Sequence, residues 1–246
     1  MNSKYAFFTV DVERFADTEC VANSDFLPKT DMMDGLDVYI NILDKHGIKA
    51  TMFALRETAM KHKDQLRKYI KNGHRLALHG ERHVAPIHLE DNIFKTELLH
   101  AKKVLEETFH SKIIGYRAPF FGIDNNKLKL LQKIGFHYDS SCLNYSAARH
   151  TTAVNLNHFS PIFDGVCVND NFYEFESSCE NVFGTGFPVS GGGYIRLSNW
   201  LFARQLLKRY INTHNYYMFY LHPFELSKEK KPYIHGLKFY DKMYLG

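Results

Sequence analysis

The sequence predicts an α/β protein with a parallel sheet, either open or closed into a barrel. Short apolar segments with strand character alternate with amphipathic segments along most of the chain, an order typical of parallel sheets. Five of the apolar segments end at an ionisable side chain, as strands do at the functional edge of such a sheet. The chain has no low-complexity linker and no internal repeat. We therefore expect residues 1–246 to form a single domain.

The predicted strands are short apolar runs, and the predicted helices carry apolar residues three and four positions apart. The strands cover 5–10, 49–55, 75–78, 112–116, 136–139 and 216–221. The helices cover 32–47, 64–73, 92–110, 125–135 and 199–215. The last helix places Trp200 on an apolar face, where we expect it to be a core residue. We expect residues 141–194 to be less regular, and the tail after Ser227 is polar.

Composition excludes several classes of protein. Hydrophobic residues make up 45% and charged residues 24% of the chain, which is ordinary for a soluble globular protein. The net charge is +4, but the basic residues are scattered and form no stripe with interleaved aromatics, so nucleic-acid binding is not supported. The mild positive charge favours an anionic substrate.

The sequence also indicates a reducing compartment and no membrane span. No apolar run approaches the ~20 residues of a membrane helix, and the apolar run before Asp11 is too short for a signal-peptide core. The cysteines match no zinc ribbon and no compact disulfide framework, so we expect free thiols. They are Cys20, Cys142, Cys167 and Cys179. We therefore predict a cytoplasmic protein.

Ionisable side chains follow five of the predicted strands. They are Asp11 with Glu13, His79 with His83, Arg117, Asp139, and His222. Because the carboxyl ends of parallel strands lie on one face of the sheet, we expect these side chains to converge. Two histidines four residues apart and a carboxylate can hold a divalent metal with open positions. A second carboxylate can act as a base, a histidine can protonate a leaving group, and an arginine can orient the base.

Each of these residues also has a simpler interpretation. Asp11 could cap a helix, and the histidine pair could lie on the surface or in the core. Arg117 could form a structural salt bridge, and His222 could mark only the end of a strand. The ordered set favours the functional interpretation of each.

Six motifs, spread over residues 9–226, give the chain a family resemblance. They read TVDVE, HGERH, YRAPFFGI, GFHYDSS, GGGYIR and LHPFEL. In this order they resemble the NodB-like polysaccharide deacetylases of carbohydrate esterase family 4, in the branch whose first motif is Asp-x-Glu. The resemblance implies a deformed (β/α) barrel. It also implies a catalytic domain that removes an acyl group from a sugar with the help of a metal.

The resemblance also implies roles for individual residues. Glu13, His79 and His83 would bind the metal, and Asp11 would be the catalytic base. Arg117 would position Asp11, and the backbone amide of Phe120 would help to hold the oxyanion. His222 would be the general acid. Asp139 would tune the acid or orient the arginine. Gly192, Gly193 and Tyr194 lie in a motif that could be a tight turn. We favour contact with substrate for these three.

Two positions depart from the family pattern. Gly80 replaces the Ser or Thr that usually follows the first metal-binding histidine, so a hydroxyl that would hydrogen-bond near the metal is missing. Glu13 is one methylene longer than aspartate, and Asp11 would be the ligand if Glu13 cannot reach the metal. Two nitrogens and one oxygen suit zinc, and cobalt, nickel or iron would also fit.

The predicted substrate is an acetylated amino sugar. Because a cytoplasmic enzyme does not reach mature cell-wall polymer, we expect a nucleotide-linked or lipid-linked precursor of a surface polysaccharide. Two alternatives stay open. One is hydrolysis of a different amide, such as a sugar formamide or a cyclic ureide. The other is an inactive carbohydrate-binding barrel.

Overall fold

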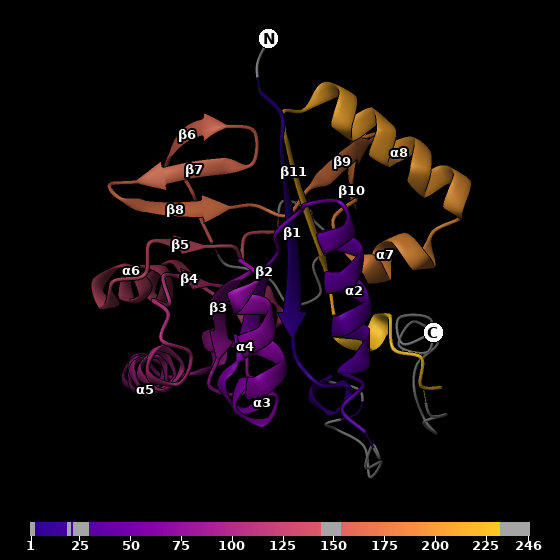
Figure 1. The fold of residues 1–246 in the computed structure, drawn as a ribbon. Helices are drawn as coiled ribbons and strands as arrows, with labels where there is room; N and C mark the ends of the chain where they lie inside the picture. Colours follow the sequence, from indigo (N-terminus) through magenta and orange to yellow (C-terminus); the bar gives the residue numbers. More distant parts are fainter. Residues whose placement is uncertain (1–2, 19–20, 22–29, 144–153, 232–246) are drawn as a thin grey trace.

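The computed structural model describes residues 3–18, 21, 30–143 and 154–231. Nine strands of this part of the chain form one sheet. They are β1 (Tyr5–Val12), β2 (Thr51–Leu55), β3 (Arg75–Gly80), β4 (Gly115–Tyr116), β5 (Tyr138–Asp139), β6 (Ser160–Phe163), β7 (Val166–Asn169), β8 (Phe172–Phe175) and β11 (Tyr216–Leu221). Their order is β11-β1-β2-β3-β4-β5-β8-β7-β6 (Figure 1). Neighbours from β11 to β8 run parallel, and β7 and β6 are antiparallel.

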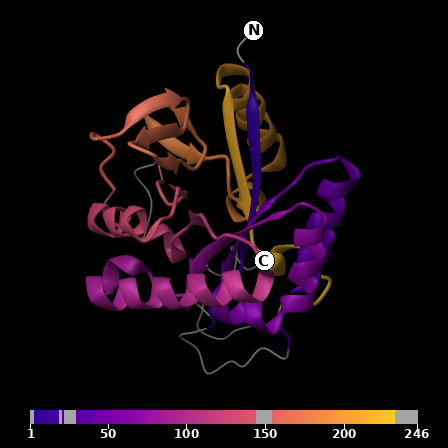
Figure 2. The ribbon, with the colours of Figure 1, turned by 60° about the vertical axis from the view of Figure 1, so that its left-hand side comes forward.

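The helices lie outside the curved sheet (Figures 1 and 2). They are α2 (Asp34–Lys45), α3 (Arg56–Lys61), α4 (Lys63–Lys71), α5 (Asp91–Phe109), α6 (Asn125–Ile134), α7 (Gly192–Leu197) and α8 (Trp200–Thr213). Short 3-10 turns cover Phe15–Asp17, Pro86–His88, Pro119–Phe121 and Pro223–Glu225. The predicted helices are present with small changes at their ends.

Alternation along β1 separates the core from the inside of the barrel. Val10 and Val12 pack in the main core with Leu36 of α2. On the opposite face of the strand, Thr9 and Asp11 hydrogen-bond to a buried arginine. Successive side chains of a strand point to opposite faces. The same eight residues therefore stabilise the helical layer and supply polar groups to the interior.

The segment after β8 nearly closes the sheet into a barrel. The Tyr216 hydroxyl donates to the carbonyl of Glu176 over 2.6 Å. The amide of Met218 donates to Ser178 Oγ over 2.8 Å, and the amide of Tyr220 donates to the carbonyl of Ser190 over 2.9 Å. These bonds join β11 to the chain that leaves β8. The prediction of a deformed (β/α) barrel is confirmed.

Residues 141–194 are more regular than we expected. They contain β6, β7 and β8, and a separate antiparallel hairpin of β9 (Cys179–Val182) and β10 (Thr185–Pro188). These strands have four residues each, which is too short for a clear alternation of apolar and polar residues. The glycine-rich motif begins α7 rather than forming only a turn.

Three further expectations concern Trp200, the cysteines and a membrane span. Trp200 is 63% exposed, so the prediction that it is a core residue is wrong. The described cysteines, Cys142, Cys167 and Cys179, are free, and Cys20 lies outside the described residues. No helix in the described ranges has both the length and the apolar character that a membrane crossing requires.

Candidate active site

The polar residues of the site come from strand ends at one edge of the sheet. Glu13 follows β1, and His79 is the last residue but one of β3. Gly80 has φ +129°, a conformation that disfavours residues with a side chain. Its backbone lets the chain turn sharply after His79, so that His83 comes back towards Glu13. The glycine that departs from the family pattern therefore has a structural reason.

Glu13, His79 and His83 bring their ligand atoms together. One ligand atom of each lies within 4.8 Å of the others. Glu13 Oε2 is 2.7 Å from His83 Nε2 and 3.6 Å from His79 Nε2. This buried oxygen makes no hydrogen bond of normal geometry, as expected for donor atoms that converge on a shared cation. The chemistry and placement of the three side chains fit a divalent metal.

The other nitrogen of each imidazole is fixed by a backbone carbonyl. His79 Nδ1 lies 2.8 Å from the carbonyl oxygen of Arg117. His83 Nδ1 lies 2.7 Å from the carbonyl oxygen of Asp17. A carbonyl only accepts hydrogen bonds, so each Nδ1 carries a hydrogen, and in the neutral ring each Nε2 presents a lone pair towards Glu13. The structure thereby fixes the tautomer that metal binding requires.

Glu13 is charged in spite of its burial. Burial raises the pKa of its carboxyl, but without a metal ion the positive charges of protonated His83 and His222 outweigh this effect and hold the pKa well below its usual range. A carboxylate in this place is matched to positive charge. The environment of Glu13 therefore favours a cation.

Asp11 is held by a fully buried arginine. Arg117 Nη1 donates to Asp11 Oδ1 over 2.7 Å and to Thr9 Oγ1 over 2.9 Å. Arg117 Nε and Nη2 donate to the carbonyl and the hydroxyl of Ser140, and the guanidinium lies 4.2 Å from the ring centre of Phe53. These contacts fix one oxygen of the Asp11 carboxylate in a single orientation.

His222 lies next to Glu13 and has a second carboxylate partner, Glu225. Its Nδ1 is 2.8 Å from Glu225 Oε1, and its Nε2 is 3.5 Å from Glu13 Oε1. Burial lowers the pKa of His222, but the charges of Glu13, Glu225 and Asp11 outweigh it and raise the pKa to about 9. Glu225 lies in the motif LHPFEL but is not among the residues predicted from the sequence.

The turn after Arg117 has an unusual backbone. Phe120 and Phe121 have φ values of +56° and +55°, which residues other than glycine adopt at a cost. The Phe120 ring lies 4.2 Å from the ring centre of His83. Strained backbone of this kind is typical of sites that position a group for function.

Asp139 pairs with Glu174, a carboxylate that is not among the residues predicted from the sequence. Its carboxylate accepts from the amide and the hydroxyl of Ser141, and the hydroxyl of Ser141 in turn accepts from the amide of Ala118. Burial raises the pKa of Asp139 to about 6, although a hydrogen bond with Glu174 acts to lower it. Burial and the charge of Asp139 raise the pKa of Glu174 well above its usual range. The two fully buried carboxyls therefore share a proton.

We expect this pair to make stability fall as pH rises. Both pKa values are raised in the folded state, so above about pH 4 these two carboxyls hold more protons in the folded protein than in the unfolded protein. The free energy of unfolding then decreases with pH through about 6 by up to about 1.4 kcal/mol per pH unit for each proton. Glu174→Gln removes one proton, and urea unfolding across this range should show a shallower loss. Glu107→Gln on the surface of α5 is the control, and equal slopes in all three proteins would contradict the pairing.

The glycine-rich motif packs against Glu225. A Cβ at Gly192 would lie 2.6 Å from Glu225 Oε2, so a side chain at this position would displace the Glu225 carboxylate. Arg196 Nη2 lies 3.2 Å from the same oxygen. Gly193 is buried in the first turn of α7, and Tyr194 follows it. Contact of Gly192, Gly193 and Tyr194 with substrate stays a prediction.

Comparison with known proteins gives two family matches and several relatives. Residues 31–138 match the family model described as polysaccharide deacetylase, and residues 149–245 match a domain of unknown function, DUF3473. A peptidoglycan deacetylase of Helicobacter pylori is 25% identical over 146 residues, which are 59% of this chain and 45% of the relative. A peptidoglycan deacetylase-like protein of Gibberella zeae is 28% identical over 46% of this chain and 34% of its own. The chain thus spans less than half the length of both relatives.

Solved structures have the same fold. A protein from Mycobacterium smegmatis that is assigned to the polysaccharide deacetylases superposes with a TM-score of 0.59 and 22% identity, over 90% of this chain and 78% of that one. An allantoinase superposes with a TM-score of 0.60 and 15% identity over the same shares. At these identities the likeness concerns the fold alone.

Proposed function

The chain belongs to the NodB-like polysaccharide deacetylase family of carbohydrate esterase family 4, and from this premise we propose that it is a metal-dependent hydrolase that removes an N-acetyl group from an amino sugar. The observation that carries the proposal is the cluster of Glu13, His79 and His83 next to His222. A nucleotide or lipid linkage in the substrate, a surface-polysaccharide pathway, a cytoplasmic location and a single catalytic domain over residues 1–246 stay predictions.

Glu13, His79 and His83 would hold the ion through one oxygen and two imidazole nitrogens. This donor set suits zinc, and cobalt, nickel or iron would also fit. When bound, such an ion lowers the pKa of water and polarises a carbonyl. The carbonyl partners of both imidazoles keep Nε2 available for the ion.

The other residues would move protons and hold charge. Asp11 would take a proton from the attacking water, with its orientation set by Arg117. The backbone amide of Phe120 would donate to the oxyanion. His222 would give a proton to the leaving amine, with its ring held by Glu225. For Asp139 the pairing with Glu174 favours a positioning role, through Ser141 and the amide of Ala118.

An assay with defined metals tests the proposal. Metal-free protein is supplied with Zn²⁺, Co²⁺, Ni²⁺ or Fe²⁺ and incubated with N-acetylated amino sugars, free and nucleotide-linked, and acetate and new amine are measured. We expect acetate release that depends on metal. Formate or a ring-opened acid from a formamide or a ureide, without acetate, would instead indicate another amide. Stoichiometric metal with no hydrolysis of any acylated sugar would indicate a binding barrel.

We expect Glu225→Gln to lower kcat on the order of 10²-fold, because a small misplacement of a proton donor has an effect of this size. Gln keeps the hydrogen bond to the backbone amide of His222 but loses the charge that faces the imidazole. KM should change little, and the pH dependence of kcat should shift on the side where a protonated group is required. Glu229→Gln, four residues further along the chain, is the matched control. A normal pH profile in Glu225→Gln would show that Glu225 does not act through His222.

A further inference from the structure

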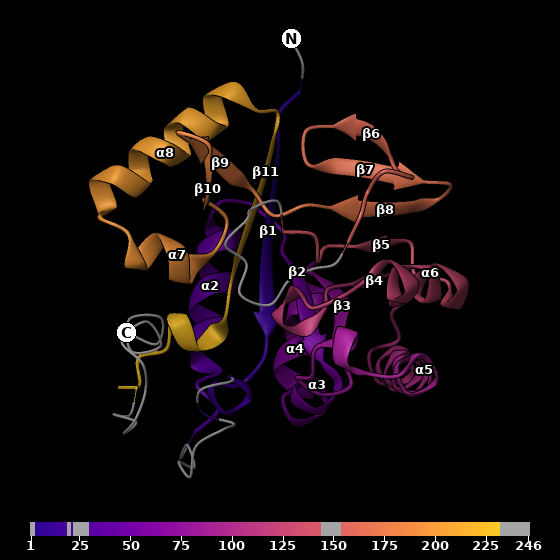
Figure 3. The same ribbon diagram turned by 180° about the vertical axis from the view of Figure 1, so that it is seen from behind.

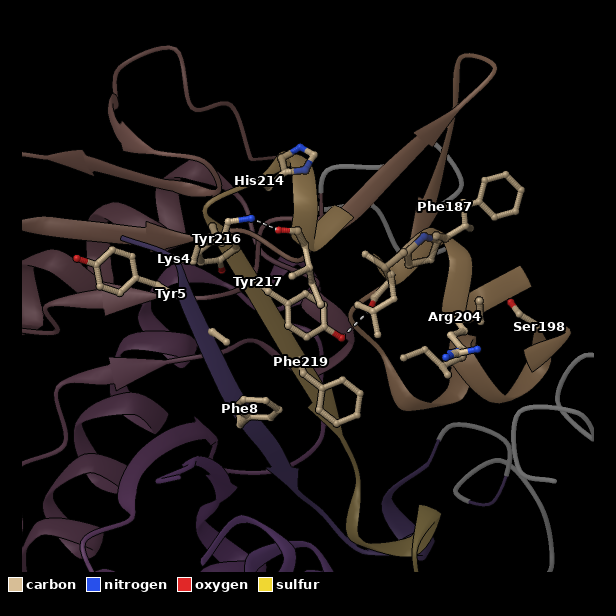
Figure 4. A pocket seen from close by; sticks show the side chains of 18 of the residues that line it. Lys4, Tyr5, Phe8, Phe187, Ser198, Arg204, His214, Tyr216, Tyr217 and Phe219 are labelled. Carbon is tan, nitrogen blue, oxygen red and sulfur yellow. Dashed lines mark hydrogen bonds between the residues drawn. The ribbon is translucent and has the colours of Figure 1, made fainter. Parts of the chain in front are cut away.

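A large apolar cavity lies away from the candidate active site. Its volume is about 550 Å³, in the range of small-ligand sites. The walls come from the start of β1, from β10 and β11, and from α7 and α8 (Figure 4). Tyr5 and Ala6 of β1 line it, whereas Asp11 is at the other end of the same strand. The ligand of this cavity is therefore not the sugar at the metal site.

The lining excludes a strongly polar ligand. It consists mainly of aromatic and aliphatic side chains, among them Phe8, Phe219 and Leu206. Its polar groups are largely engaged within the protein: the Tyr217 hydroxyl donates to the carbonyl of Val189 over 3.0 Å, and the Lys4 ammonium donates to backbone carbonyls at the end of α8 (Figure 4). A sugar or a nucleotide needs several polar partners at fixed positions. A hydrocarbon chain needs none.

The surface around the cavity continues this apolar character. The first three residues of α8, Trp200, Leu201 and Phe202, are 63%, 69% and 43% exposed. Phe202 packs edge to face on Phe187 of β10, with 5.9 Å between the ring centres, and both Trp200 and Phe187 line the cavity. A hydrocarbon chain bound in the cavity would thus extend out of it across an exposed apolar rim. Figure 3 shows α8 lying along β9, β10 and β11 on the outside of the molecule.

The charges on α8 favour an apolar ligand that carries a negatively charged group. Helix α8 contains three basic residues and no acidic one. Arg209 pairs with Glu180 over 3.1 Å, but in the described ranges no carboxylate lies within ion-pair distance of Arg204, which lines the cavity. Trp200 and Arg204 are four residues apart and therefore lie on the same side of α8, since residues i and i+4 are neighbours on a helix surface. An exposed tryptophan beside basic residues is typical of elements that lie at a lipid surface.

We propose that this cavity binds the hydrocarbon chain of an anionic lipid, with the lipid phosphate at Arg204 and the rim of α8 at the membrane surface. A second protein copy or a partner helix would cover the rim, whereas a flexible hydrocarbon chain can also enter the apolar cavity. The proposal does not depend on the deacetylase chemistry, because the cavity and the metal site share no residue.

The chain's only tryptophan makes the proposal testable, because Trp200 lines the cavity. The full-length protein is titrated with monomeric lysophosphatidylglycerol and with lysophosphatidylcholine, both below their micelle concentrations. We expect the emission of Trp200 to shift to shorter wavelength and to saturate, with tighter binding of the anionic lipid. A brominated acyl chain should quench the emission.

Two variants distinguish the contribution of the lipid's hydrocarbon chain to binding from that of its head group. Arg204→Gln should weaken binding of lysophosphatidylglycerol about five-fold. It should weaken binding of lysophosphatidylcholine by less, because the choline charge already offsets its phosphate, whereas Lys129→Gln on α6 should change neither. Ala203→Phe should fill the cavity and abolish quenching. If this variant does not fold, the Arg204→Gln and bromine measurements still decide.

Several results would overturn the proposal. One is an absence of any response to either lysolipid, and another is equal binding of both lipids that Arg204→Gln does not alter. A response to vesicles of phosphatidylglycerol without any response to the monomeric lipid would indicate adsorption without entry into the cavity. A dimer by light scattering, with Trp200 emission already at short wavelength and insensitive to lipid, would assign the surface to a second copy.

Discussion

Asp11→Asn is expected to lower kcat by about 10²–10⁴-fold, the usual contribution of a positioned base, while the protein keeps its metal. Asn has nearly the shape of Asp and can still accept from Arg117, whose Nη1 is 2.7 Å from Asp11 Oδ1. It cannot take a proton from water. The measurement is kcat on the best acetylated amino sugar, together with metal content by mass spectrometry.

Two outcomes would contradict this role of Asp11. Activity close to that of the parent protein would show that another group is the base. Loss of metal together with activity would make Asp11 a ligand, the alternative that the extra methylene of Glu13 left open in the sequence. Asp64→Asn, whose side chain is 85% exposed on α4, is the matched control and should change neither quantity.

Arg117→Met is expected to reduce the free energy of unfolding by about 3–5 kcal/mol, the usual cost of removing one partner of a buried ion pair. Arg117 is fully buried, and Asp11 is 1% exposed. The substitution leaves the Asp11 carboxylate buried without its cation, and it also leaves Thr9 and Ser140 without a donor. Urea unfolding is measured with a chelator present, so that loss of metal does not contribute to the difference.

A double variant separates the charge from the packing. When Asp11→Asn is added to Arg117→Met, the unpaired charge disappears, and we expect part of the lost stability to return. If Arg117→Met costs less than about 1 kcal/mol, or if the double variant is less stable than the sum of the single effects predicts, the ion pair does not hold the barrel interior together as described.

The sequence was sufficient for the strands that carry the site, because their signal is local. Residues 216–221 were predicted as a strand and form β11 with the same bounds. Residues 112–116 were predicted as a strand, but only Gly115–Tyr116 pair, since the apolar pattern does not report where hydrogen bonding begins. The strands between Ser160 and Pro188 were missed, because their pairing partners lie in other short segments and no local periodicity identifies them.

The same distinction holds for the site. Strand ends point to Asp11, His79, Arg117 and His222 because a parallel sheet brings its carboxyl ends together. The partner of Asp139 could not be predicted in this way, since Glu174 lies in β8, inside the segment that seemed irregular. Glu225 was within reach of the sequence, three residues after His222, but its role depends on the 3-10 turn that folds it back onto the imidazole.

Metal binding by the isolated protein tests the central claim most directly. Metal-free protein is titrated with Co²⁺, followed by its absorption spectrum, and then with Zn²⁺ in competition. The account predicts one tightly bound ion per chain, and a loss of affinity of more than about 100-fold in Glu13→Gln and in His79→Gln, since even a change next to a ligand costs 10–100-fold. The spectrum of the His83→Gln variant should change as well. Binding that is weak and non-stoichiometric, or that survives all three substitutions, would contradict the account.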